Sequence, residues 1–171
     1  MAAEPAITSY GAKSAQAPRQ LDFFAFLVGR WQGIGKTQTP DGSTAQFDVT
    51  WIGRYILNGM AIADEFHSLT ADGKPYLGIS LRFFDVLHDG WIIEYLNVSN
   101  SFIRRQVNVQ SGSVQREGNT VVVISGDGEM RIRENYRHAD ETHFTYSTAS
   151  SLDGGQTWGE ISIEVSLERV E

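Results

Sequence analysis

From Trp31 onward the chain alternates apolar and polar residues with a period of two, and short turn sequences interrupt this alternation repeatedly. The turns read PDGS, ADGK, HDG, EGN, GDGE, HADE and LDGG, and they are rich in the residues that tight hairpins require. A period of two indicates strands with one face in the core and one face in solvent. We therefore expect an all-β fold, a single antiparallel up-and-down β-barrel of about 8–10 strands, because closure removes the exposed edges of a long meander.

One segment before the first expected strand has a helical pattern instead. In LDFFAFLVG, residues 21–29, the side chains of Leu21, Phe24, Phe26 and Leu27 form one apolar face and Gly29 ends the element. The sequence therefore predicts a short N-terminal helix that closes one end of the barrel. Residues 1–20 are expected to form a flexible tail, which leaves residues 21–171 as one barrel domain.

Composition excludes several classes of function. The chain has 171 residues and a formal net charge of −7, and its basic residues form no run longer than Arg104-Arg105, so we expect no nucleic-acid partner. No apolar run approaches the ~18 residues of a spanning helix, so no membrane partner is expected either. The absence of cysteine excludes disulfides and thiolate metal sites. The first twenty residues lack the pattern of a signal peptide, from which we expect a cytoplasmic protein.

The four histidines give no sign of a metal site. His67, His88, His138 and His143 show neither a His-x-His nor a His-Glu-x-x-His spacing. No metal is therefore expected.

The start and the end of the predicted barrel resemble the calycin superfamily, which includes the lipocalins. Gly29-Arg30-Trp31 is similar to the Gly-x-Trp motif that opens the first strand of these proteins. In calycins a basic side chain near the end of the last strand packs across this tryptophan. The resemblance implies that role for Arg169, with Arg30 as the alternative, and a guanidinium stacked on an indole supplies the physical reason.

Two narrower resemblances to barrel families can be weighed for what they imply about a ligand. The phrases FAFLVGRWQGIGK, GMAIADEF and SLDGGQTW resemble a bacterial calycin-like family without an assigned activity, so this likeness implies the fold and no chemistry. The opening GRWQGIG is also similar to nitrobindin-like barrels, which bind haem through a histidine near the chain end. Here no histidine follows His143, so we expect no haem and no other cofactor.

Several polar side chains fall on the apolar, inward faces of the predicted strands. The alternation places these residues inside the barrel, together with the aromatic residues Trp51 and Trp91: Asp64, Tyr95, Asn97, Arg105, Glu134, Tyr136 and Tyr146. Inward polar groups beside aromatic ones and small glycines are typical of a small-molecule pocket. The alternative is a filled barrel in which these groups only satisfy one another, or a bulge that turns part of a strand outward.

Three hypotheses about function follow. The first is binding of a small apolar or aromatic molecule inside the barrel, with ligand contacts from Tyr95, Asn97, Arg105, Tyr146, Trp51 and Trp91. The second is a cofactor-independent lyase, isomerase, cyclase or hydratase. In it, Glu134 or Asp64 acts as general base, and Tyr136, with the other inward tyrosines and Arg105, stabilises an oxyanion. The third is an interaction protein, such as a homodimer that pairs outer barrel faces.

The stretch SLDGGQTW matches the Asp-box pattern Ser-x-Asp-x-Gly-x-Thr-Trp, which is best known from sialidase-like propellers. Its composition is that of a hairpin turn, since an Asp carboxylate accepts backbone N–H bonds and glycines adopt positive φ. We expect Asp153 to brace a turn between the last two strands and Trp158 to cover it. These residues are therefore predicted to be structural.

Overall fold

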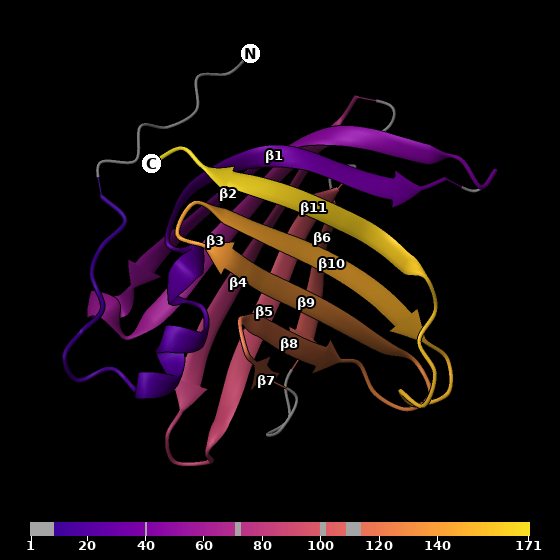
Figure 1. Cartoon of the computed structure of the whole chain (residues 1–171). Helices are drawn as coiled ribbons and strands as arrows, with labels where there is room; N and C mark the ends of the chain where they lie inside the picture. The colour runs from indigo at the N-terminus through magenta and orange to yellow at the C-terminus, as the bar shows by residue number, and fades with distance from the viewer. Residues whose placement is uncertain (1–8, 40, 71–72, 100–101, 109–113) are drawn as a thin grey trace.

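The chain folds into one antiparallel sheet of eleven strands, which curls into a nearly closed barrel (Figure 1). The computed structural model describes residues 9–39, 41–70, 73–99, 102–108 and 114–171, with the backbone alone for residues 98–99 and 102–108. The strands are β1 (Gly29–Gln38), β2 (Thr44–Ile56), β3 (Ala61–Leu69), β4 (Pro75–Asp85), β5 (Gly90–Ser99), β6 (Phe102–Asn108), β7 (Val114–Glu117), β8 (Thr120–Ser125), β9 (Arg131–Asp140), β10 (His143–Ser151) and β11 (Ile161–Arg169).

Strand order follows the chain. Each strand pairs with its sequence neighbour except at the β6 and β7 edges, and β1 also pairs with β11. In this register Trp31 lies opposite Trp51 on β2 and opposite Arg169 on β11. The predicted single antiparallel up-and-down barrel is confirmed.

The segment before β1 plugs one end of the barrel, but it is not the single helix that the sequence predicts. It forms two 3₁₀ helices, η1 (Arg19–Phe23) and η2 (Ala25–Leu27). The buried residues Leu21, Phe24 and Leu27 recur every third position, which matches the three residues per turn of a 3₁₀ helix. Phe26 falls off this face and instead stacks on His138. None of the helices in the described part of the chain is long and apolar enough to span a membrane.

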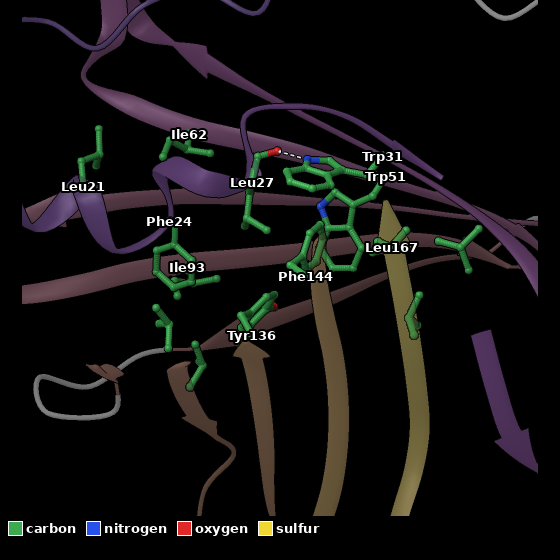
Figure 2. Packing of buried hydrophobic residues seen from close by; sticks show 14 of the residues in the cluster. Leu21, Phe24, Leu27, Trp31, Trp51, Ile62, Ile93, Tyr136, Phe144 and Leu167 are labelled. Atoms are coloured by element: carbon green, nitrogen blue, oxygen red, sulfur yellow. Dashed lines mark hydrogen bonds between the residues drawn. The ribbon is translucent and has the colours of Figure 1, made fainter. Parts of the chain in front are cut away.

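The plug and the adjoining strand ends form the hydrophobic core (Figure 2). Leu27 accepts a hydrogen bond at its backbone oxygen from the indole N–H of Trp31, at 3.1 Å. Phe144 presents its ring edge-on to Trp31 and to Trp51, with centroids 4.8 and 5.6 Å apart. The hydrophobic core therefore occupies the plugged end of the barrel.

Arg169 lies across the indole of Trp31, with its guanidinium carbon 4.0 Å from the ring centroid. The guanidinium donates hydrogen bonds to the backbone oxygens of Val28 (2.8 Å), Phe26 (3.2 Å) and Glu141 (2.9 Å). One side chain from the last strand thus joins the plug, the first strand and the β9–β10 turn. Arg169, rather than Arg30, has the geometry that the calycin resemblance implies.

Residues 9–20, which fall within the predicted tail, make specific contacts with the plugged end. The Tyr10 hydroxyl donates to Glu171 at 2.7 Å, and Lys13 pairs with Asp22 at 2.6 Å. The backbone N–H of Ser14 donates to the Gly59 oxygen at 3.1 Å. This part of the chain therefore packs against the barrel.

The Asp-box residues form the turn between β10 and β11, at the end of the barrel opposite the plug (Figure 1). Asp153 accepts backbone N–H bonds from Gln156 and Thr157, both at 2.9 Å, and a hydroxyl bond from Thr157 at 2.6 Å. These hydrogen bonds, that of the Thr157 hydroxyl first, hold the pKa of the Asp153 carboxyl below its usual range. Gly154 and Gly155 supply the positive φ angles of the turn.

Candidate functional site

A cavity of about 760 Å³ lies inside the barrel, between the core and the unplugged end. Its rim includes Thr37 and Ala45 beside the β1–β2 turn and Leu69 beside the β3–β4 turn. This volume falls within the ~300–1,000 Å³ range of small-molecule sites. The barrel is therefore not filled by its own side chains.

Two glycines make room for the aromatic rings of this cavity. A Cβ atom added to Gly35 would lie 2.2 Å from the Phe47 ring, and one added to Gly78 would lie 2.4 Å from the Tyr95 hydroxyl. Any larger residue at these positions would push the ring into the cavity or out of its place. Glycine in these strands thus sets the shape of the cavity.

Seven aromatic side chains form part of the cavity wall. Trp51 lies at the centre of this wall, edge-on to Phe66 at 5.5 Å and near Tyr146 at 5.3 Å between centroids. The buried indole N–H of Trp51 has no hydrogen-bond partner among the described residues. The aromatic lining residues are Phe47, Trp51, Phe66, Tyr76, Tyr95, Tyr136 and Tyr146.

A buried ion pair lies on the cavity floor. Asp64 on β3 and Arg82 on β4 are 2% and 1% exposed, and Asp64 Oδ2 contacts Arg82 Nη1. The Arg82 guanidinium is enclosed by the rings of Phe24 and Tyr136, at 5.0 and 5.3 Å from their centroids. A carboxylate already neutralised by a guanidinium is a weak proton acceptor. The geometry therefore favours Asp64 as a partner of Arg82 over Asp64 as a general base.

Glu134 on β9 accepts hydrogen bonds from two phenols at the same carboxylate oxygen. The Tyr146 and Tyr136 hydroxyls donate to Glu134 Oε1 at 2.7 and 3.3 Å, and Arg82 Nη2 donates to the Tyr136 hydroxyl at 3.0 Å. Burial first, and then the negative charge of Glu134, raise the pKa of both phenols. Both tyrosines therefore stay protonated at neutral pH and act as hydrogen-bond donors.

A second polar group lies on β4 and β5. The hydroxyls of Tyr76 and Tyr95 are 3.1 Å apart, and the Asn97 amide donates to Tyr76 at 3.3 Å. Burial is the main cause that raises the pKa of the Tyr95 phenol, followed by its hydrogen bond with Tyr76. The cavity thus combines an aromatic wall with two separate sets of hydroxyl groups.

The structure brings most of the predicted site residues together around this cavity. Six of them line it: Trp51, Asp64, Tyr95, Glu134, Tyr136 and Tyr146. Asn97 does not line the cavity, but its side-chain amide donates a hydrogen bond to the hydroxyl of Tyr76, which does. Arg105 lies in β6 opposite Leu96, and its side chain falls outside the described residues.

Trp91 does not line the cavity, contrary to its predicted role as a ligand contact. It is 5% exposed and packs in the core, with its ring 5.0 Å from Phe24 and 5.6 Å from Phe84 between centroids. The reason is its position near the start of β5, at the plugged end of the barrel. Only farther along β5 do Ile93 and Tyr95 reach the cavity.

Arg82 is the main site residue that the sequence pattern does not predict. In LGISLRFF, Leu77, Ile79 and Leu81 form the more apolar of the two alternating sets, which is the set that usually faces a core. The structure shows the reverse, since Leu77 is 38% exposed and Arg82 is buried. The available signal was Asp64 itself, because a carboxylate on an apolar strand face needs a buried cation.

No group of three or more His, Asp or Glu side chains in the described ranges is arranged to hold a metal ion. The ionisable lining residues are Asp48, Asp64, Arg82 and Glu134, besides the tyrosines.

Solved structures share this architecture. The crystal structure of Rv2717c from M. tuberculosis aligns with a TM-score of 0.55 and 16% identity, over 91% of this chain and 99% of that one. The S-type phycobiliprotein lyase CPES from Guillardia theta aligns with a TM-score of 0.50 and 10% identity, over 88% and 91% of the two chains. No protein-family model and no curated protein sequence matches the chain. At these identities the likeness shows that the chain has the fold of known antiparallel β-barrel proteins.

Proposed function

We propose that the protein binds a small, mostly apolar or aromatic molecule inside the barrel. The observation that carries this proposal is the cavity of about 760 Å³, whose lining includes seven aromatic side chains. A filled barrel, the expected feature of a purely structural protein, would leave no such space. The Gly-x-Trp start and the stacked Arg169 support placing the chain among calycin-like barrels.

The polar groups of the cavity would orient the ligand. The hydroxyls of Tyr76 and Tyr95 supply hydrogen-bonding groups on the wall formed by β4 and β5. Apolar contacts thus provide most of the binding free energy, and a few hydrogen bonds select the orientation.

Quenching of tryptophan fluorescence tests this proposal, because Trp51 is the one tryptophan among the described cavity-lining residues. Titration with 4-nitrotoluene, an apolar contact quencher, should give saturable quenching. Trp51→Phe should lose most of the saturable part, whereas Trp158→Phe, altered at the β10–β11 turn, should keep it. Unsaturable quenching in all three proteins, or full quenching in Trp51→Phe, would show that the probe does not enter the barrel.

A second candidate function is proton transfer to or from a bound substrate without a cofactor. It is favoured by Glu134, a carboxylate that lines the cavity and is hydrogen-bonded to two phenols with raised pKa values. Glu134 would take a proton from carbon next to a carbonyl group, and a tyrosine hydroxyl would stabilise the enolate oxygen. This is the chemistry of a lyase or an isomerase.

Proton exchange tests this second function. With 4-phenylbutan-2-one in D₂O, deuterium should enter the positions next to the carbonyl faster with the protein than without it, as followed by NMR. Glu134→Gln should slow the protein-dependent exchange about 100-fold or more, the typical contribution of a general base. Glu164→Gln, on the exposed side of β11, is the matched control. Equal exchange in Glu134→Gln and the unmodified protein would exclude Glu134 as the base.

A further inference from the structure

The charged groups among the described cavity-lining residues do not balance. Among the described lining residues there are three carboxylates, on Asp48, Asp64 and Glu134, and one guanidinium, on Arg82. Arg82 is in contact with Asp64, and two aromatic rings enclose it. The positive charge of Arg82 is therefore already neutralised by Asp64.

Glu134 has no cationic partner among the side chains that the structure describes. Its hydrogen bonds come from Tyr136 and Tyr146, which are neutral donors, and no described Lys, Arg or His forms an ion pair with it. A partly buried carboxylate without a counter-charge is unfavourable compared with a paired one. A positive charge on a bound molecule would remove this imbalance.

The surroundings of Glu134 suit an organic cation rather than a metal ion or a simple salt ion. The aromatic wall around Trp51 presents ring faces and edges, and a cation is attracted to the electron-rich face of an aromatic ring. The negative charge of Glu134 contributes to the raised pKa of Tyr95, Tyr136 and Tyr146. Carboxylate and aromatic rings together are the usual recognition set for alkylated ammonium groups.

We propose that the molecule bound in the barrel is an organic cation, an amine that carries an apolar or aromatic body. Its ammonium group pairs with Glu134, and its body lies against the wall that includes Phe47, Trp51 and Phe66. This inference rests on the proposed binding function and narrows it to one class of ligand. An anionic ligand would meet Glu134 as a like charge, and a neutral one would leave Glu134 unpaired.

A matched ligand series tests the inference by isothermal titration calorimetry on the full chain. The probes are 4-phenylbutylammonium, 4-phenylbutan-1-ol and 4-phenylbutanoate, which share one hydrocarbon body and differ in charge. The ammonium should bind at least about tenfold tighter than the alcohol, because only the ammonium forms an ion pair with Glu134. The carboxylate should bind more weakly than the alcohol.

Glu134→Gln assigns the preference to one residue. In this variant the ammonium should fall to within about twofold of the alcohol, because the ion pair is lost. Glu164→Gln makes the same charge change on an exposed part of β11 and should keep the full preference. A preference that survives in Glu134→Gln would contradict the assignment to Glu134.

The series separates failure of the inference from failure of the proposed function. If all three probes bind and the ammonium has no advantage, the cation inference is wrong and the binding function stands. If none of the probes binds, both are wrong. The comparison of probes on the unmodified protein decides the inference even if Glu134→Gln does not fold.

Discussion

Replacement of Arg82 by methionine is expected to lower the free energy of unfolding by about 3–5 kcal/mol. Arg82 and Asp64 are 1% and 2% exposed, so loss of the guanidinium leaves Asp64 as a buried, unpaired carboxylate. The Tyr136 hydroxyl also loses the hydrogen bond that Arg82 donates. Urea unfolding followed by far-UV circular dichroism measures the change.

A second ion pair on the same barrel provides the control. Arg54 on β2 pairs with Glu65 on β3, but their side chains are 33% and 26% exposed. Arg54→Met should therefore cost only about 0–1 kcal/mol. Adding Asp64→Leu to Arg82→Met should recover much of the loss, because it removes the unpaired charge. Equal costs for Arg82→Met and Arg54→Met would show that the buried pair does not stabilise the cavity floor.

Replacement of Trp31 by alanine is expected to cost about 3–5 kcal/mol, the usual range for a fully buried aromatic side chain. The Trp31 side chain is completely buried, bonds the plug at Leu27, meets the edge of Phe144 and supports Arg169. The melting temperature should fall by about 10 °C. Differential scanning calorimetry measures this shift.

Trp158, in the turn between β10 and β11, is the matched control for Trp31. It is partly exposed, and the guanidinium carbon of Arg133 lies 5.9 Å from its ring centroid. Trp158→Ala should therefore cost about 1 kcal/mol or less. If both variants lost the same stability, the plugged end would not be the main source of stability in this barrel.

The period-two alternation allows the fold and the inward faces to be predicted from the sequence. Successive side chains of a strand point to opposite faces, so the alternation alone places Asp64, Tyr95 and Glu134 inside the barrel. The alternation is informative here because these strands are long and are joined by short turns. Bulges, such as the register shift after Thr148, affect only the ends of strands.

Alternation carries no information about height along the barrel axis, and this limits what the sequence predicts about the site. Trp91 and Tyr95 share one face of β5, but one lies in the core and the other in the cavity. Height depends on strand tilt and register, which side-chain pattern alone does not specify. The pairing of Asp64 with Arg82 is also not evident from the pattern, since Leu77, Ile79 and Leu81 of β4 alternate with the buried Ser80 and Arg82.

A cavity-filling variant and its matched control test whether a small molecule binds inside the barrel. Thr148 lines the cavity, whereas Thr145 on the same strand β10 is not among the lining residues and lies three positions away, on the opposite face. Calorimetric titration of 4-phenylbutan-1-ol should show at least about a tenfold loss of affinity, about 1.4 kcal/mol, in Thr148→Trp. Thr145→Trp should bind as the unmodified protein does, with thermal melts showing that both variants fold. Unchanged affinity in folded Thr148→Trp would show that the alcohol does not bind in this cavity.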